Sequence, residues 1–259
     1  MRFALKISLL LVLLFSAEFS FAQSAEQALA QGQDVNVLFR NESTGNISVN
    51  SRDGFSANYR RLWHVTGTRK RLIEFELCGI HHPKELKKKQ PHGKSYYYGK
   101  LNTLTFLRAG YGYQQTLYRR AERKSIEVRM VYTVGPTLCF AKPVFLEIEY
   151  PDTLSAPGTS TDNFITKIEQ YDPEKHNQYN ILGRAPLFYG IDRTKVFPGA
   201  HAKLGFSFEY GETRTSIKAL EVGAIVDYFP QSIRTMAFVE PENFFVTLYV
   251  GFTFGKRWF

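Results

Sequence analysis

Hydrophobic and polar residues alternate along most of the chain after residue 35, and the alternation is clearest near its end. In residues 243–254 every even position is apolar, whereas the odd positions are mostly small or polar. A period of two is typical of a β-strand, because successive side chains point to opposite faces. The apolar face of this segment therefore lies either in the core of a sandwich or against lipid.

The same period recurs in further segments, which brings the expected number of strands to about eight. The other predicted strands are one within 35–50 and those at 54–66, 69–81, 96–109, 125–146, 201–210 and 216–229. Two residues fit this pattern poorly. Arg61 falls on the apolar face of its strand, and Pro136 lies inside a long strand, where a proline would interrupt the hydrogen-bond ladder. A bulge or a split strand is therefore expected near Pro136.

A membrane-spanning chain without apolar helices must form a closed sheet. No run of 18 apolar residues follows residue 22, so the sequence predicts no transmembrane helix there. Lipid offers no hydrogen-bond partner to an open sheet edge, and only closure satisfies every backbone group. We therefore predict an all-β fold, a closed antiparallel transmembrane β-barrel of about eight strands that occupies residues 35–259.

The connections between these strands are unequal in length, as is usual in bacterial barrels. If both chain ends lie in the periplasm, the outer loops are 51–53, 82–95, 147–197 and 230–242, and the inner turns are 66–68, 110–124 and 211–214. The connection at 147–197 is too long for a simple hairpin. A loop of this length is usually functional or partly disordered, and we expect it to fold over the barrel mouth.

The first 22 residues have the layout of a cleaved secretory signal peptide. Arg2 and Lys6 precede an apolar run at 7–15, and Ser20 and Ala22 are small residues at the expected cleavage positions. The run is shorter than the roughly 20 residues that a spanning helix needs, which argues against an anchor. A short polar segment at 23–34 follows. The predicted location is the cell outer membrane.

The predicted mature chain is basic and poor in cysteine. Without Arg2, Lys6 and Glu18 it has 31 basic and 23 acidic residues, a net charge of +8. An exported protein seldom meets nucleic acid, so the expected anionic partners are outer-membrane lipids and lipopolysaccharide. The two cysteines, Cys78 and Cys139, exclude a disulfide-rich scaffold. Both are predicted to face inward with one strand between them, and a disulfide between them is left open.

Charged residues occupy the predicted inner face. They are Glu74, Glu76, Arg129, Lys203, Glu209, Glu221 and Asp227. The interior of an eight-stranded barrel is only wide enough for side chains, and buried charges must be paired. We therefore predict a salt-bridged plug in which Arg129 pairs with Glu74 or Glu76. A proton or ion path is the alternative.

The predicted outer loop at 81–94 is rich in lysine and histidine. Its lysines are Lys84, Lys87, Lys88, Lys89 and Lys94. Lysine binds phosphate as a point charge, so these residues are candidates for lipopolysaccharide contact; a merely solvated basic loop is the alternative. The histidines at 81, 82 and 92 lack a carboxylate or cysteine pattern that would complete a metal site. No spacing singles out a Ser–His pair, and we predict no catalytic residue, metal or cofactor.

The ending LYVGFTFGKRWF looks like the terminal strand of outer-membrane barrels. By that resemblance Val250, Phe252, Phe254 and Phe259 form the signal for the barrel assembly machinery. The segments HHPKE (81–85), YGK (98–100), AKPV (141–144), YDPEKH (171–176), GRAP (183–186), ALEVGA (219–224) and FGKRW (254–258) resemble an uncharacterised outer-membrane β-barrel family of the Bacteroidetes. The resemblance covers most of 40–258. It implies a fold and a Gram-negative outer membrane, but no activity.

These observations favour a small integral outer-membrane barrel with a structural or surface-binding role and a plugged polar lumen. A lipid A-modifying hydrolase is an alternative, because some small barrels are enzymes. A narrow channel is a further alternative.

Overall fold

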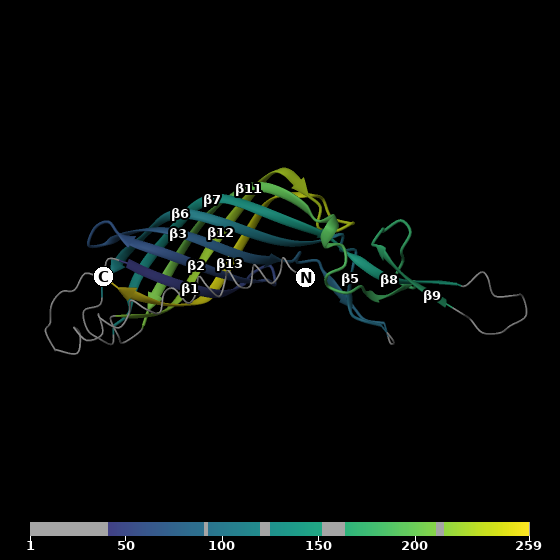
Figure 1. Cartoon of the computed structure of the whole chain (residues 1–259), viewed down its shortest axis with the longest axis horizontal. Helices are drawn as coiled ribbons and strands as arrows, with labels where there is room; N and C mark the ends of the chain where they lie inside the picture. The colour runs from purple at the N-terminus through teal and green to yellow at the C-terminus, as the bar shows by residue number, and fades with distance from the viewer. Residues whose placement is uncertain (1–40, 91–92, 120–124, 152–163, 211–214, 259) are drawn as a thin grey trace, which may run out of the picture.

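Eight strands form a closed antiparallel barrel in the computed structural model, which confirms the predicted fold class (Figure 1). The model describes residues 41–90, 93–119, 125–151, 164–210 and 215–258, so the predicted signal peptide and the segment 23–34 lie outside the described residues. The barrel strands are β1 (Asn41–Asn50), β2 (Phe55–His64), β3 (Arg69–Ile80), β6 (Asn102–Tyr118), β7 (Glu127–Pro143), β11 (Lys195–Glu209), β12 (Ser216–Ile233) and β13 (Glu242–Trp258).

The order around the barrel is β1-β13-β12-β11-β7-β6-β3-β2, and the pairing of β1 with β13 closes the sheet. We call the end where β1 begins and β13 ends the terminus end, and the opposite end the extension end. Within the described residues, no helix is both long and apolar enough to cross a membrane.

The alternating pattern gives the barrel an apolar outside and a polar inside. In β13 the outward side chains are exposed although they are apolar, and they are Phe244, Val246, Leu248, Val250, Phe252 and Phe254. The inward residues of β2 and β3, such as Asn58, Arg60 and Glu74, are buried although they are polar or charged. This distribution is the reverse of that of a water-soluble protein and is typical of barrels surrounded by lipid.

The predicted turn at 110–124 is wrong, because residues 110–118 continue β6. The sequence GYGYQQ has the composition of a turn, but its glycines face inward and its tyrosines outward. Gly112 lies so close to β7 that an added Cβ would be 1.9 Å from the carbonyl oxygen of Tyr132. The glycines thus allow close packing inside the barrel and do not end the strand.

Pro136 and Arg61 are also accommodated. The strand β7 runs unbroken through Pro136, which is aligned with Ala200 of β11 and whose side chain is exposed, so the expected split does not occur. Arg61 lies near the terminus end, and its guanidinium stacks on the ring of Trp258 at 4.3 Å. An aromatic partner at the edge of the apolar belt makes a cation there acceptable.

The long loops at the extension end form a structure of their own, which we call the extension. It contains β4 (Leu86–Lys88) paired with β5 (Tyr96–Tyr98), and a three-stranded sheet of β10 (Ile181–Arg184), β8 (Phe145–Pro151) and β9 (Phe164–Gln170). The buried side chains of Tyr96, Leu146, Ile148, Tyr171 and Ile181 form its core. In Figure 1 the extension projects beyond the barrel. The predicted loop at 147–197 is therefore partly a folded sheet, and it does not simply cover the barrel mouth.

Candidate functional site

The lumen is filled by four layers of side chains stacked along the barrel axis. Their order follows the inward positions of β3, which pass from Lys70 at the terminus end through Leu72 to Glu74 and Glu76, and then to Cys78 and Ile80. Charged and apolar layers alternate along this row. The layers bring together residues that the sequence alone could assign only to an inner face.

The first layer, the inner cluster, is a balanced set of ion pairs at the terminus end. Its members are Glu42, Lys70, Glu127, Arg129, Glu209 and Arg257. Arg129 lies 2.7 Å from both Glu127 and Glu209. The expected pairing of Arg129 with Glu74 or Glu76 is therefore wrong. Arg129 lies nearer the terminus end of the barrel, and other cations neutralise those two carboxylates.

A thin apolar layer of Leu62, Leu72 and Val131 separates the inner cluster from a second set of charges. This set, the central cluster, contains Arg60, Arg108 and Lys203 together with Glu74, Glu76, Glu221 and Asp227. All of these side chains are almost fully buried. The structure thus places all seven predicted lumen charges inside the barrel, divided between the two clusters.

Two arginines organise the central cluster. Arg60 binds Glu221 in a bidentate manner, with Nη1–Oε2 and Nη2–Oε1 distances of 2.5 and 2.6 Å. Arg108 also binds Asp227 through two hydrogen bonds, from Nε to Oδ1 at 2.9 Å and from Nη2 to Oδ2 at 2.7 Å. The planar guanidinium matches the two carboxylate oxygens, which makes such pairs strong and geometrically specific. Neither arginine was among the predicted site residues, because a partner across the barrel cannot be assigned from a single strand.

Lysine and hydroxyl groups complete the central cluster. The Nζ atom of Lys203 lies 2.5 Å from Glu74 and 2.6 Å from Glu76. The hydroxyl of Tyr249 donates a hydrogen bond to Glu221 at 2.8 Å. Since the cluster has one more carboxylate than cations, such neutral donors help to hold the excess negative charge.

The fourth layer is an apolar plug at the extension end, which the sequence analysis did not predict. Its buried members are Cys78, Ile80, Leu104, Phe106, Cys139, Ala141, Phe229, Ile233 and Phe245. The rings of Phe106, Phe229 and Phe245 contact one another, with centroids 5.2 to 5.7 Å apart. The inward position of Phe245 and Phe229 follows from the strand period, but the mutual contact requires the closed barrel.

The two cysteines belong to this apolar plug and are free thiols. They are aligned with the same residue, Phe106, from opposite sides of β6. Two neighbouring strand spacings amount to about 10 Å. That separation exceeds the span of a disulfide, so the disulfide that the sequence left open does not form in this structure.

Polar contacts join the extension to the barrel. Within the connection between β3 and β6, Lys100 pairs with Glu85 at 2.7 Å, and both side chains are nearly buried. Burial lowers the pKa of Lys100, and the hydrogen bond and charge of Glu85 partly oppose this effect. On the barrel side, Arg52 binds Glu242 at 2.9 Å, and His82 lies 3.7 Å from the same carboxylate. The extension is therefore attached by specific contacts.

The basic residues of the 81–94 segment divide into two groups. Lys94 forms an exposed salt bridge with Glu147 at 3.0 Å, and Lys88 hydrogen-bonds Gln178. The other three, Lys84, Lys87 and Lys89, are exposed and form no salt bridge with any described residue. The nearby carboxylate of Glu85 is directed to Lys100. The extension thus carries an uncompensated basic patch, which we define as Lys84, Lys87 and Lys89.

The histidines form no metal centre within the described residues. His82 accepts a hydrogen bond from the backbone of Lys84, His176 accepts one from the backbone of Asp172, and His201 contacts Thr137. The part of the chain that the structure describes holds no group of three or more potential metal ligands, and residue 92 lies outside it. Nothing in this geometry specifically favours hydrolysis.

The predicted assembly signal lies on the outer surface of β13. Val250, Phe252 and Phe254 face outward and are exposed, whereas Phe259 lies outside the described residues. Outward aromatic residues close to the terminus end are in the place expected for a recognition element on the last strand. Whether the assembly machinery binds them stays a prediction.

Comparisons with known proteins add no family. No family model and no curated protein matches the chain. Solved structures with similar folds include neisserial surface protein A, with a TM-score of 0.40 and 8% identity over 85% of this chain and 97% of that chain. The attachment invasion locus protein Ail of Yersinia pestis gives 0.38 and 8% over 85% and 100%. The outer-membrane enzyme PagL gives 0.32 and 9% over 83% and 98%.

Proposed function

We propose that this protein is a non-conducting outer-membrane barrel that holds a folded extension at the cell surface, where the extension binds anionic groups such as lipopolysaccharide phosphates. The observation that carries the proposal is the combination of an apolar exterior, a filled lumen and, within the described residues, a folded extension at one end of the barrel. A water-filled pore would need an open lumen, and a soluble barrel would need a polar exterior.

The exterior supports membrane insertion. Monomeric soluble proteins rarely expose contiguous apolar patches larger than a few hundred Å². Here the outward apolar side chains follow one another from strand to strand, as in the aligned residues Val49, Val250 and Val222. Lipid is the solvent in which such a surface is stable. The signal peptide expected from the sequence would direct the chain to that membrane in a Gram-negative cell.

The layered lumen supports a structural role over the channel alternative. An ion would have to pass two sets of bidentate or bridging ion pairs and then the apolar plug. The purified mature protein, folded into planar bilayers, is therefore expected to give no stepwise conductance. Heat-modifiable migration on a gel would establish that the same sample is folded. Regular current steps from the folded sample would contradict the proposal and favour a channel.

The basic patch supports binding of phosphate groups at the surface. Its three ammonium groups are exposed, lie close together in sequence and lack carboxylate partners among the described residues. Lysine is a flexible point charge that suits multiply phosphorylated headgroups. Long-range attraction also raises the local concentration of an anionic ligand.

Charge reversal in the basic patch is expected to weaken lipopolysaccharide binding. The double variant Lys84→Glu/Lys87→Glu should bind lipopolysaccharide roughly fivefold more weakly for each positive charge lost, measured by titration of the folded protein in detergent. The matched control is Lys167→Glu/Lys175→Glu, which reverses two exposed lysines elsewhere in the extension. Equal losses of affinity in both variants would show that only the net charge of the protein matters. Unchanged affinity in the first variant would show that the basic patch does not bind lipopolysaccharide.

A further inference from the structure

A loop beside the barrel rim exposes apolar side chains that the proposed function does not use. We define the rim loop as residues 185–194, which connect β10 to β11 and include the short helix η1 (Ile191–Arg193). The side chain of Lys142 donates a hydrogen bond to the carbonyl oxygen of Leu187. Because even-numbered residues of β7 face outward, this contact places the rim loop against the outer side of the barrel wall.

The rim loop is ordered. Backbone hydrogen bonds join Tyr189 to Pro186 and Arg193 to Gly190. Gly190 has a φ of 81°, and an added Cβ would lie 2.4 Å from the ring of Phe145. The rings of Tyr189 and Phe145 meet edge to face at 5.3 Å. Only glycine accepts both the positive φ and the close approach. This packing fixes the direction of the neighbouring side chains.

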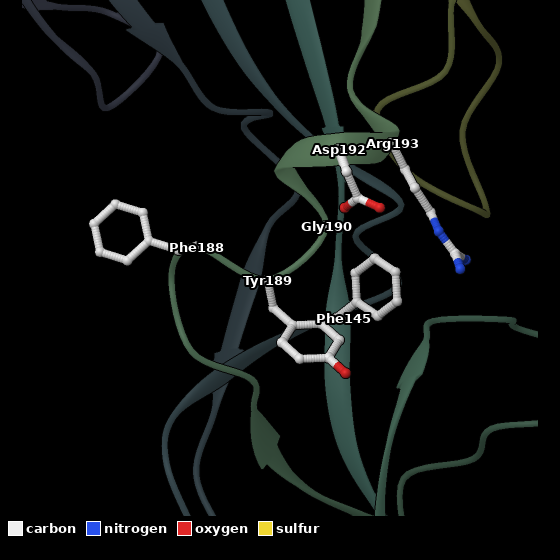
Figure 2. Close-up of a pocket in the computed structure, with 6 residues that line it drawn as sticks. All are labelled: Phe145, Phe188, Tyr189, Gly190, Asp192 and Arg193. Atoms are coloured by element: carbon white, nitrogen blue, oxygen red, sulfur yellow. The ribbon is translucent and has the colours of Figure 1, made fainter. Parts of the chain in front are cut away.

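The apolar side chains of this ordered loop point away from the protein. Leu187, Phe188 and Ile191 are 68%, 82% and 53% exposed. Phe188 lines a pocket together with Tyr189, Asp192 and Arg193, and in Figure 2 its ring is directed apart from those of Tyr189 and Phe145. A mobile loop could turn such residues inward, but a fixed one presents them permanently. An apolar environment outside the chain would stabilise side chains that are held in this way.

The position of the rim loop along the barrel axis indicates which environment this is. The outward apolar row of β7 extends from Val128 to Phe140, and Val196 of β11 is aligned with Phe140. The twelve steps from Val128 to Phe140, at the usual rise and tilt, span about 30 Å along the barrel axis, the thickness of a hydrocarbon core. Lys142 is the next outward residue, so the rim loop lies where the outer leaflet meets its headgroups.

Cations accompany the apolar side chains. Arg184 and Arg193 are exposed, and neither forms a salt bridge with a described residue. Lys195 is exposed as well, but it precedes the outward Val196 and is aligned with the buried Ala141, so it faces the barrel mouth. The guanidinium of Arg193 stacks on Phe145 at 5.6 Å, which holds it beside the loop. Asp192 is the only carboxylate within the rim loop. Apolar groups beside unpaired cations match a lipid that carries acyl chains and phosphate.

We propose that the rim loop is a lipid-binding wedge: Leu187, Phe188 and Ile191 enter the outer leaflet, and Arg193 binds the phosphate of an outer-leaflet lipid of the lipid A class. The wedge rests on the proposed insertion of the barrel and adds to it a specific contact at one side of the rim. It would hold the base of the extension against the membrane surface, because β10 enters the loop directly.

The test measures the depth of single fluorescent labels in the folded protein. Phe188→Cys carries an environment-sensitive fluorophore, and the protein is reconstituted in vesicles of phosphatidylcholine with lipid A. Tyr179→Cys is the matched control, because Tyr179 is an aromatic residue of the extension that is 93% exposed. Both native cysteines are buried, so labelling after folding is selective. The label at 188 should be quenched by nitroxide-bearing lipids and shielded from iodide, and the label at 179 should show the opposite.

A third label separates the wedge from the membrane proposal. Val250→Cys places the fluorophore on the outward face of β13, where insertion predicts strong quenching by nitroxides deep in the bilayer. Quenching at 250 with free iodide access at 188 would overturn the wedge and leave the barrel proposal intact. Iodide access at both positions would overturn both proposals.

The phosphate contact has its own readout. Arg193→Gln should lower the amount of lipid A retained by the detergent-purified protein by roughly fivefold, as detected by mass spectrometry of the intact complex. The control Lys167→Gln should retain lipid A as the wild type does. Unchanged retention in the rim-loop variant would refute the phosphate contact.

Discussion

Replacing Arg60 by methionine is expected to lower the free energy of unfolding of the barrel by about 3–5 kcal/mol. The substitution leaves Glu221 without its bidentate partner and takes one donor from Glu74, while both carboxylates remain buried. The free-energy cost of an unpaired buried carboxylate exceeds the stabilisation that the methionine side chain gains by packing in place of arginine. The measurement is the urea midpoint of folding in lipid vesicles, followed by gel migration or tryptophan fluorescence.

Two controls separate the lost pairing from a general loss of charge. Arg60→Met/Glu221→Gln removes both partners and should recover part of the stability, since no strong unpaired charge is left at that position. Lys175→Met removes an exposed cation that lies 3.5 Å from Asp172 and should change the stability by less than about 1 kcal/mol. Equal destabilisation by Arg60→Met and Lys175→Met would show that the central cluster contributes little.

Placing lysine at Val250 is expected to destabilise the folded barrel by about 2–4 kcal/mol. Val250 faces outward at the middle of β13, next to Val49 and Val222 on the neighbouring strands. A charge there would lie in the hydrocarbon interior. Lysine at Phe254, near the terminus end, should cost less because its ammonium can reach the interface. The folded fraction in vesicles, measured for each variant, checks the expectation.

A lumen position on the same strand provides the contrast. Thr253 faces inward, and its hydroxyl lies 3.4 Å from Glu221. Lysine at Thr253 should be milder than lysine at Val250, since a carboxylate is within reach. Destabilisation by lysine that alternates from residue to residue along 244–254, and that is largest at mid-strand, would support membrane insertion. Equal tolerance of lysine on both faces would refute it.

The sequence predicts the barrel well because each strand has one face toward lipid and the other toward the lumen. Apolar and polar residues therefore alternate along the strand, and this alternation can be read from the sequence. The outward rows of β7, β11 and β13 follow from alternation alone. The predicted turn at 110–124 is wrong because glycines are common in turns, whereas Gly110 and Gly112 allow close packing of β6 against β7. A glycine within a strand differs from a glycine in a turn by the residues of the neighbouring strand that pack against it. A single sequence does not show which residues these are.

The candidate site was predictable in part. Inward charges could be listed, but their partners depend on closure: Arg60 of β2 meets Glu221 of β12, and Arg129 meets Glu209 of β11. The fold of the extension was missed because β4, β5 and β10 are too short to show a period. The rim loop was missed for a related reason, since Leu187 and Phe188 become unusual only when their exposure is known.

The ion pairs of the lumen also make folding of the barrel cooperative. Arg60 and Glu221 are 161 residues apart, and Lys203 and Glu74 are 129 apart. Arg60 and Glu74 can pair with each other once β2 and β3 have formed, but Glu221 reaches Arg60 only with β12, and Lys203 reaches Glu74 only with β11. A half-built barrel therefore carries lumen charges that are only partly neutralised and must stay hydrated, and the late strands complete their pairing. A chain whose barrel does not close would keep these charges exposed, and the charges would oppose its insertion into lipid.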